Sequence, residues 1–327
     1  MRTALVTGGT GLVGSNLVHA LVEDGVRVRV LCRTGSDLRG IAGTDAEVVY
    51  GDVRDPEAVG RAIKGCDTVF HTAAIISHWP KERPAMHDIN VRGTAVVVEA
   101  CMRSNVEKVV HTSSIATIGP AAHDDVMTED TPYAPGSYPV GYRASKHAAE
   151  QDILKRVGHG LPAVIVNPAV IMGRRDYRFH GGRIIRDVVR RRIFYAPAGG
   201  TNIVSVDDVV AGHLAAARLG RVGERYILAG ENRSFEEIFG ITAEETGGIA
   251  PRFNIPRSVV WSVAALVEGG ARVLGTRPWV TRELVAGIGR FRRYCSEKAH
   301  RELGYTYRSF RTTVRETYAW YRAEGLL

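Results

Sequence analysis

The chain has 327 residues, 45% of them hydrophobic and 24% charged, a composition that argues against a disordered or fibrous protein. Its net charge of +8 is uneven: residues 1–173 carry −2 and residues 174–327 carry +10, and 25 of the 26 basic residues in the second half are arginines. No uncharged apolar run approaches the roughly 18 residues that cross a bilayer, so we expect no integral membrane segment. The four cysteines lie far apart without a CxxC pair, so we expect free thiols and a cytoplasmic protein.

The first half of the chain alternates short β-branched segments with helical patterns. Strands are predicted at 3–7, 27–32, 46–51, 68–74, 108–114 and 162–168, and helices at 12–24, 55–63, 87–104 and 141–157. Strands that are separated by helix-length segments form right-handed βαβ units and a parallel sheet. The pattern therefore predicts an α/β fold with a doubly wound sheet.

The second half is less regular. We predict loop with one short helix over 174–200, a strand end and a helix over 204–219, and a strand at 225–230. Ser234 followed by Glu237 is a capping-box signature that predicts a helix over 234–247. The apolar segment 258–267 predicts a short helix that packs on the core or on a partner surface. We expect two interleaved lobes, one of residues 1–173 with about 201–222, and a smaller one of about 174–200 with 223–327.

Glycines cluster where the first predicted strand meets the first helix. In TGGTGLVG (7–14), Gly9, Gly11 and Gly14 satisfy GxGxxG, and Gly8 adds a second spacing, GxxGxxG. Glycines at such a turn let the backbone approach a pyrophosphate, which the helix N-terminus attracts. In this context the motif predicts a Rossmann-type dinucleotide site; glycines that only make a turn are the alternative.

The end of the second strand bears on which dinucleotide binds. An NAD site typically has Asp or Glu there to bind the ribose 2′-hydroxyl. Arg33 follows Leu31 and Cys32 instead, and its guanidinium suits a 2′-phosphate. We therefore favour NADP(H), with NAD(H) as the alternative.

Two further segments carry residues suited to proton transfer. Tyr142 and Lys146 form YxxxK at the start of a predicted helix, where residues four apart share a face. A nearby ammonium lowers the pKa of a phenol, which suits it to protonate a carbonyl oxygen during reduction. Thr112, Ser113 and Ser114 follow a predicted parallel strand, at the edge of the sheet where ligands bind.

Together these motifs resemble the extended short-chain dehydrogenase/reductase family, which includes NAD-dependent epimerases and dehydratases. The resemblance covers nearly the whole chain. Within the family, the chain is most similar to the dihydroflavonol-4-reductase-like branch and to hopanoid-associated sugar epimerases. Its motifs occur in the family's order: TGGTGLVG, Gly51-Asp52-Val53, HTAA (71–74), INVRGT (89–94), TSSIATIG (112–119), YRASK (142–146), NPAVIMG (167–173), VSVDDVV (204–210) and RELGY (301–305).

The resemblance implies roles for the matching residues. It implies a catalytic set in which Ser114 orients the carbonyl, with Ser113 as fallback, Tyr142 is the general acid/base and Lys146 holds the nicotinamide ribose. Cofactor contacts are implied at Gly8, Thr10, Gly11, Leu12, Val13, Gly14, Asp52, Val53, Ala73 and Asn167. It also implies a homodimer that pairs the helices at 87–104 and 141–157. Asn90 is either near the cofactor or structural.

Histidines need a separate interpretation. No HxxxH or HExxH pairing occurs, so we expect no metal site. His71 matches a strand residue of the family and is expected to be structural. His78 and Trp79 lie in a predicted loop and are candidates for substrate contact.

The family's chemistries can be told apart in part. Family dehydratases carry an acidic residue directly after the active-site hydroxyl, where this chain has Ile115, so we set dehydration aside. Epimerases usually show the acid that Arg33 replaces, so we interpret the chain as an NADPH-dependent reductase of a ketone or aldehyde. An NAD-dependent NDP-sugar epimerase is the alternative, in which Arg174, Arg175 and Arg183 hold a diphosphate. A non-catalytic NADP(H) sensor would not need the Ser-Tyr-Lys set.

The basic second half has two interpretations that remain after the motifs are placed. Nucleic-acid binding has no supporting motif. The arginines of 174–192 either hold an anionic small-molecule substrate or form a solvated surface, which we favour.

Overall fold

The computed structural model describes residues 1–119, 125–134, 141–192, 195–251, 255–286 and 289–327. Its centre is a seven-stranded sheet in the order β3-β2-β1-β4-β5-β7-β10, in which every neighbouring pair is parallel. The strands are β1 (Thr3–Thr7), β2 (Arg27–Cys32), β3 (Glu47–Tyr50), β4 (Thr68–His71), β5 (Lys108–Thr112), β7 (Ala163–Pro168) and β10 (Arg225–Leu228). This confirms the predicted doubly wound α/β fold.

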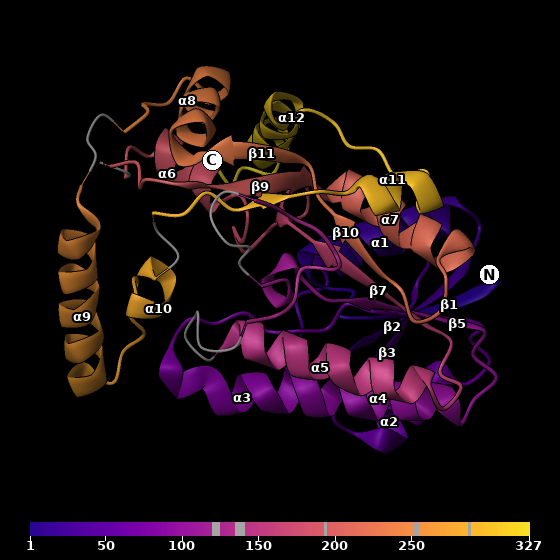
Figure 1. Cartoon of the computed structure of the whole chain (residues 1–327). Coiled ribbons are helices and arrows are strands. Elements are labelled where there is room, and N and C mark those ends of the chain that lie inside the picture. The colour runs from indigo at the N-terminus through magenta and orange to yellow at the C-terminus, as the bar shows by residue number, and fades with distance from the viewer. Residues whose placement is uncertain (120–124, 135–140, 193–194, 252–254, 287–288) are drawn as a thin grey trace.

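Helices cover both faces of this sheet (Figure 1). One face packs against α2 (Pro56–Ile63), α4 (Thr94–Met102) and α5 (Tyr142–Val157), and the other against α1 (Leu12–Glu23), α7 (Val206–Leu219) and α11 (Glu297–Leu303). Strands such as Val109–Val110 and Ala163–Val166 are apolar along their length because both of their faces are buried. The predicted helix over 87–104 is in fact α3 (Arg83–His87), a π-helical turn (Asp88–Gly93) and α4.

The second lobe is built on a three-stranded sheet of β8 (Val170–Met172), β9 (Gly200–Ser205) and β11 (Glu231–Ser234). α6 (Arg183–Val189), α8 (Phe235–Thr246) and α12 (Phe310–Ala323) enclose its core. The predicted capping box is present at the start of α8, with Ser234 and Glu237 bonded to each other's backbone. A short pair, β6 (Val126–Met127) with β12 (Arg293–Tyr294), completes the strands.

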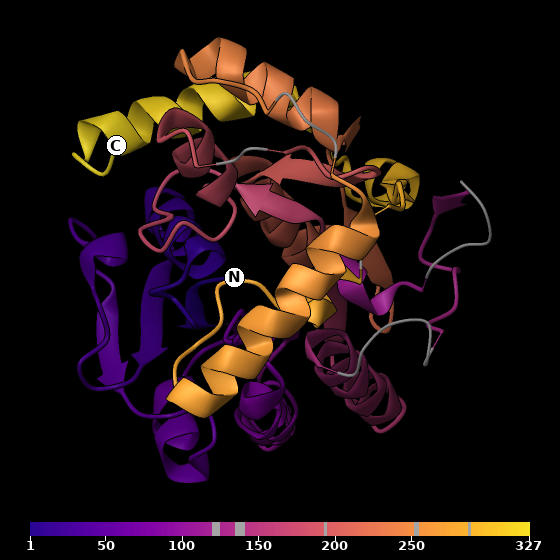
Figure 2. The same ribbon diagram turned by 90° about the vertical axis from the view of Figure 1, so that its left-hand side faces the viewer.

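Two helices stand apart from both cores. α9 (Arg257–Leu274) packs on α10 (Arg282–Val285), and Figure 2 shows α9 crossing one face of the molecule. The predicted helix ended at residue 267, but α9 continues because Glu268 is buried and accepts from the Arg282 backbone N–H and Nε, both at 2.8 Å. No helix among the described residues is long and apolar enough to cross a membrane.

Strand membership differs from the predicted lobes at three places. β8 lies within the predicted cofactor lobe of residues 1–173 but belongs to the smaller sheet. β10, which the prediction placed in the smaller lobe, is the edge strand of the main sheet next to β7. β9, which it placed with the cofactor domain, belongs to the smaller sheet, whereas the following helix α7 packs on the main one. The chain therefore crosses between the lobes more often than the sequence indicated.

Candidate functional site

The glycine turn between β1 and α1 is shaped by close backbone contacts. Gly8 has φ +71°, and a Cβ there would lie 2.7 Å from the Ala73 backbone at the end of β4. A Cβ on Gly14 would lie 2.3 Å from the Gly8 carbonyl oxygen. Only glycine combines a positive φ with the absence of a Cβ that such close contacts require. The turn can therefore lie flat against the sheet edge, as a dinucleotide site requires.

The start of α1 is open to an anion. Gly11 caps it without a side-chain hydrogen bond, and no acidic residue lies in its first turn. Arg175 lines the same hollow as Thr10, Gly11 and Leu12, and its Nη1 donates to Asn16 Oδ1 at 2.9 Å. Free N–H groups, the helix dipole and a fixed guanidinium fit a pyrophosphate. The sequence interpretation had placed Arg175 with substrate, and its place beside the glycine turn was not foreseen.

Arg33 directly follows β2 and lies near Asp52, the acid of the GDV motif. It is exposed, and its side chain has no hydrogen-bond partner among the described residues. Asp52 accepts two hydrogen bonds from the Arg54 guanidinium at 2.8 Å, and this pairing lowers the pKa of Asp52 to about 2. Arg33 adds to that effect from nearby. A cation without a hydrogen-bonded partner and an ionised carboxylate therefore lie side by side at the predicted adenosine end.

Tyr142 lies near Ser114, but its phenol is not acidic. Burial raises the pKa of Tyr142 to about 12, while a hydrogen bond with Ser114 lowers it less strongly. The sequence analysis expected Lys146 to lower this pKa. Desolvation dominates instead, so Tyr142 is a protonated phenol at neutral pH.

Lys146 is directed at the backbone of the neighbouring strand. Its side chain is buried, and Nζ donates to the Thr112 carbonyl at 2.7 Å. Burial lowers the pKa of Lys146 to about 8, and the negative charge of Glu150 opposes that shift. The ammonium therefore loses its charge a little above neutral pH.

Asn167 is tied into the support of Ser114. Its Nδ2 donates to the Ser114 carbonyl at 3.1 Å, to Thr117 Oγ1 at 3.0 Å and to Glu150 Oε1 at 2.6 Å. Its Oδ1 is buried without a hydrogen-bond partner among the described residues. That unpaired acceptor is available to a bound group, which agrees with the predicted cofactor contact at Asn167.

Asn90 supports the site from the π-helical turn. Its amide makes hydrogen bonds to both the N–H and the carbonyl of Ile75, and donates to Ser145 Oγ at 3.0 Å. These bonds join the loop after β4 to α5, which carries Tyr142. Of the two roles left open for Asn90, its bonds favour the structural one.

Three histidines form a buried layer beneath Lys146. His71 bonds Thr7 and Thr94, and His213 bonds Thr112 and the Val209 carbonyl. Neither ring nitrogen of His111 has a partner among the described residues, and burial lowers the pKa of all three. No group of three or more metal-ligating side chains was found in the described ranges.

Glu283 is a residue at the site that the sequence analysis did not identify. Glu283 of α10 accepts from Arg83 at 3.1 Å and lies 3.7 Å from His78. A Cβ on Gly141 would lie 2.3 Å from Glu283 Oε1, so this carboxylate adjoins the residue before Tyr142. No local motif marks Glu283, because its partners lie about 200 positions earlier in the chain.

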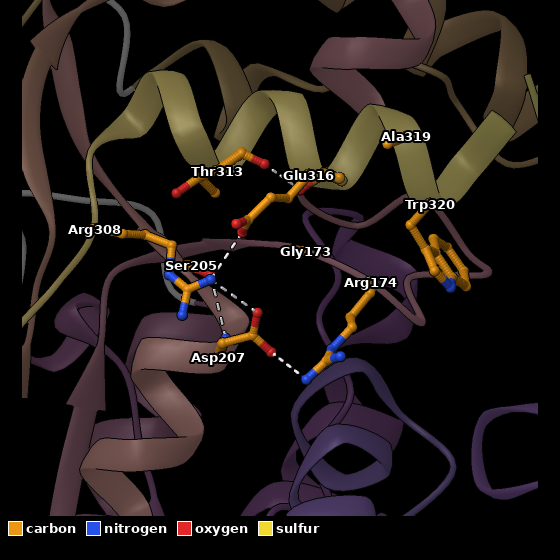
Figure 3. Close-up of a pocket in the computed structure, with 10 residues that line it drawn as sticks. Gly173, Arg174, Ser205, Asp207, Arg308, Thr313, Glu316, Ala319 and Trp320 are labelled. Atoms are coloured by element: carbon orange, nitrogen blue, oxygen red, sulfur yellow. Dashed lines mark hydrogen bonds and ion pairs between the residues drawn. The ribbon is translucent and has the colours of Figure 1, made fainter. Parts of the chain in front are cut away.

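Three of the eight arginines of 174–192, namely Arg174, Arg183 and Arg186, are paired with the protein's own acids. A cavity of about 550 Å³ lies between the start of α7 and α12. Within it Asp207 pairs with both Arg174 and Arg308, and Glu316 pairs with Arg308 (Figure 3). Elsewhere in the stretch, Asp187 pairs with Arg183 and Arg186. None of Ser114, Tyr142 and Lys146 lines this cavity. For these three arginines the pairing favours a surface role over anion binding.

Comparison with known proteins agrees with these features. The NAD dependent epimerase/dehydratase family profile matches residues 4–229. The chain is 34% identical to sterol demethylase protein B of Methylococcus capsulatus, covering 99% of this chain and 100% of that one. It is also 34% identical to a putative dihydroflavonol 4-reductase of Synechocystis, over 98% and 94%.

The chain is also similar to a ketoreductase and to a protein of known structure. A ketoreductase of Stigmatella aurantiaca, named for 4-hydroxy-2-methyl-3-oxo-4-farnesyl-3,4-dihydroquinoline-1-oxide, is 33% identical over 93% of this chain and 92% of that one. The crystal structure of gox2253 matches with a TM-score of 0.88 and 36% identity, over 100% of both chains. The chain therefore belongs to the NAD dependent epimerase/dehydratase family, the extended short-chain dehydrogenases/reductases, and is an NAD(P)-dependent oxidoreductase of that family.

Proposed function

We propose that the protein is an NADPH-dependent reductase of a ketone or aldehyde. The observation that carries the proposal is the position of Tyr142, near Ser114 and one helical turn before Lys146 on α5. A phenol whose pKa is about 12 is a proton donor at neutral pH, which is what carbonyl reduction needs.

Each residue has one task in this scheme. NADPH supplies the hydride when it is bound. Ser114 orients the substrate carbonyl by a hydrogen bond, and Tyr142 gives its proton to the carbonyl oxygen. Lys146, still charged below about pH 8, stabilises the phenolate that Tyr142 becomes.

The epimerase alternative draws no support from the arginines that suggested it. Arg174 and Arg183 are paired with Asp207 and Asp187, and Arg175 lies beside the glycine turn. A diphosphate-bearing sugar would have to displace those partners. Carbonyl reduction needs no such rearrangement, so we retain it as the proposal.

The direct test is Tyr142→Phe, assayed with NADPH over a panel of ketones and aldehydes. The panel includes apolar ring ketones, because two of the relatives are named for a sterol and a farnesylated ring ketone. We expect kcat to fall about 10²–10⁴-fold while NADPH binding is unchanged, because only the proton donor is removed. Normal turnover by Tyr142→Phe would disprove the assignment.

The cofactor preference rests on Arg33. Arg33→Asp should weaken NADPH binding by about tenfold or more and leave NADH binding little changed, because only NADPH carries a 2′-phosphate. The matched control is Arg27→Asp, which makes the same charge change at the exposed opposite end of β2. Equal affinities of Arg33→Asp and wild type for NADPH, measured by fluorescence titration, would refute the preference.

We also propose a cytoplasmic homodimer that pairs α4 and α5 of two subunits. The support for this pairing is the family resemblance, together with the exposure of Met102 at the end of α4. The four cysteines carry free thiols, which suits a reducing compartment. The mass in solution, measured by sedimentation velocity, tests the dimer.

A further inference from the structure

Residues 174–178, which we call the strap, connect the second lobe to the glycine turn. The strap follows β8 at the edge of the second-lobe sheet, and its residues 175–178 line one hollow with Thr10, Gly11 and Leu12. Gly11 and Leu12 lie where α1 begins, the end of a helix that attracts the phosphates of a dinucleotide. Because the family is dinucleotide-dependent, we expect the cofactor pyrophosphate beside this hollow.

The strap is anchored in the second lobe at Asp176, which is buried. The Asp176 carboxylate accepts from the backbone N–H groups of His180 at 2.8 Å and Gly182 at 3.0 Å. It also accepts from the hydroxyl of Tyr321 on α12 at 3.1 Å, and Tyr321 is fully buried in the second-lobe core. The position of the strap is therefore fixed by the lobe that does not carry the glycine turn.

Tyr177 joins the strap to the cofactor domain as well. The Arg39 guanidinium lies over the Tyr177 ring, 4.7 Å from its centroid, and Arg39 pairs with Asp37 in the segment after β2. The Tyr177 hydroxyl donates to Glu324 Oε2 at 3.3 Å, at the end of α12. The strap thus contacts the segment after β2 and α12 at the same residue.

Asn16 of α1 fixes the strap beside the glycine turn. Its Nδ2 donates to the Leu12 carbonyl at 2.8 Å and to the Arg174 carbonyl at 2.9 Å, and its Oδ1 accepts from Arg175 Nη1 at 2.9 Å. The reversed amide would set its NH₂ group against the guanidinium and its oxygen against two carbonyls, so these bonds determine its orientation. A buried side chain with one orientation therefore holds Arg175 close to the start of α1.

The Arg175 guanidinium has no carboxylate within ion-pair distance in the part of the chain that the structure describes. Its neighbour Arg174, in contrast, is bonded to Asp207 at 3.0 Å (Figure 3). The hydrogen bond of Arg175 to the neutral amide of Asn16 leaves most of its N–H donors for another group. Burial and the charge of Arg174 both lower the pKa of Arg175, so an anion beside it would stabilise its charged form.

The backbone of Arg175 is held in a conformation that favours glycine. Its φ is +62°, in the left-handed region that other residues adopt only where the surrounding structure imposes it. Asn16 binds the residue before it and Asp176 anchors the residue after it. These bonds place the Arg175 side chain on the hollow beside the glycine turn.

We propose that Arg175 is a ligand of the cofactor pyrophosphate, supplied by the second lobe. The N–H groups at the start of α1 bind the phosphates from the cofactor domain, and the Arg175 guanidinium binds them from the strap. A bound dinucleotide then holds the two lobes together at the glycine turn. Resting on the cofactor site of the proposed function, this role is independent of the reaction that follows.

Arg33 and Arg175 are thereby assigned to different phosphates. Arg33 follows β2, where the 2′ position of the adenosine ribose lies in a Rossmann fold, whereas Arg175 lies beside the start of α1. NADPH carries both a 2′-phosphate and a pyrophosphate, NADH carries only the pyrophosphate, and adenosine 2′-monophosphate carries only the 2′-phosphate. These ligands therefore separate the two arginines.

The test is the affinity of Arg175→Gln for these ligands, by fluorescence titration for NADPH and NADH and by calorimetry for adenosine 2′-monophosphate. Affinity for NADPH and NADH should fall equally, by about tenfold or more, because both lose a charge-assisted hydrogen bond to phosphate. Affinity for adenosine 2′-monophosphate should not change. Equal affinity of Arg175→Gln and wild type for NADH would overturn the proposal. So would a loss confined to NADPH and adenosine 2′-monophosphate, which would make Arg175 a ligand of the 2′-phosphate.

The matched control is Arg174→Gln, the same change at the adjacent arginine, whose side chain pairs with Asp207. This control should bind all of these ligands like wild type. Loss of NADH affinity equal to that of Arg175→Gln would reduce the effect to the general charge of the strap and overturn the assignment to Arg175.

Arg175→Gly separates binding from folding. Glycine adopts a φ of +62° without strain, so this variant should keep a urea midpoint close to that of wild type. It should nevertheless lose affinity for NADH as Arg175→Gln does. A lower urea midpoint in both variants with unchanged affinity would show a structural tie to Asn16 instead of a phosphate ligand.

Hydrogen exchange tests the link between the lobes. Saturating NADPH should slow the exchange of the His180 and Gly182 N–H groups, which bond Asp176, in wild type but not in Arg175→Gln. Equal protection in both proteins would overturn the link. None of these measurements needs turnover, so wild type that binds NADPH but reduces no carbonyl would refute the proposed function and leave the role of Arg175 intact.

Discussion

Glu150 is a fully buried carboxylate one helical turn beyond Lys146. It accepts from Thr117 and Asn167, and Arg225 of β10 lies 3.4 Å away. Because Asn167 also donates to the Ser114 carbonyl, Glu150 holds the backbone that carries the catalytic hydroxyl. We regard it as a positioning residue whose charge also acts on the protons of Tyr142 and Lys146.

That charge gives a pH prediction. The negative charge of Glu150 raises the pKa of both Tyr142 and Lys146. Carbonyl reduction should decline as pH rises through about 8, where Lys146 loses its proton. Glu150→Gln keeps an acceptor oxygen but removes the charge, so the alkaline limb of kcat/KM should move to lower pH.

The control for this prediction lies on the same helix. Asp152→Asn also removes one negative charge from α5, but from a residue that pairs with Arg156 at the surface. Its pH profile should match that of wild type. An unshifted alkaline limb in Glu150→Gln would show that Glu150 acts through its hydrogen bonds alone.

Sequence reasoning at the residue scale succeeded where the chemistry is local. The YxxxK spacing predicted that Tyr142 and Lys146 share one helix, and both lie on α5. The motif after β5 predicted that Ser114 lies near Tyr142. It failed for the sign of the Tyr142 pKa shift, because desolvation depends on everything packed around the phenol. Glu283 and Arg175 were missed or misplaced for a related reason: their partners come from distant segments.

At the element scale, the glycine turn allows backbone strain at a positive φ to be separated from the close contact between Gly8 and Ala73. Gly8→Ala places a Cβ against the Ala73 backbone and also requires a left-handed residue at φ +71°. We expect a loss of about 1–3 kcal/mol from the backbone strain alone, with a further loss from the clash, and weakened NADPH binding. Urea unfolding and fluorescence titration measure the two effects.

Gly25→Ala is the matched control. Its φ of +73° is nearly the same, but nothing lies within 4 Å of the added Cβ. It should show only the backbone strain and bind NADPH normally. If both variants lost the same stability, the contact between Gly8 and Ala73 would have no energetic role.

Helix limits were predictable where capping is local and not elsewhere. The Ser234 capping box fixed the start of α8 from sequence. The end of α9 was placed too early because the prediction followed only the apolar segment 258–267, and Arg282, which binds Glu268, lies beyond that segment. α12 was not predicted at all, although Ser309 caps it and its buried face packs in the second lobe.

The whole molecule shows why the lobe boundary could not be read along the chain. β9 and β10 follow each other closely in sequence but belong to different sheets, with α7 packed on the main one between them. A single arginine, Arg308, joins the start of α12 to α7 through Asp207 and Asp208. Hydrophobic periodicity reports whether a segment is buried, not which sheet buries it.

The three buried histidines bind protons more weakly in the folded protein than in the unfolded chain. An unfolded histidine takes up a proton below about pH 6.5. In the folded protein burial lowers the pKa of His71 to about 3 and of His213 to about 4, and that of His111 well below its usual value. At pH values between the folded and the unfolded pKa of a histidine, unfolding takes up a proton. The free energy of unfolding should therefore fall as pH falls below about 6.5, by about 1.4 kcal/mol per pH unit for each histidine.

Urea midpoints measured between neutral pH and pH 5 test this acid sensitivity. His111→Phe should flatten the decline, because it removes one proton acceptor whose ring makes no hydrogen bond to the described residues. His159→Phe, at an exposed position, should leave the slope unchanged. The same uncharged imidazoles that sit under Lys146 would then set the lower pH limit at which the fold survives.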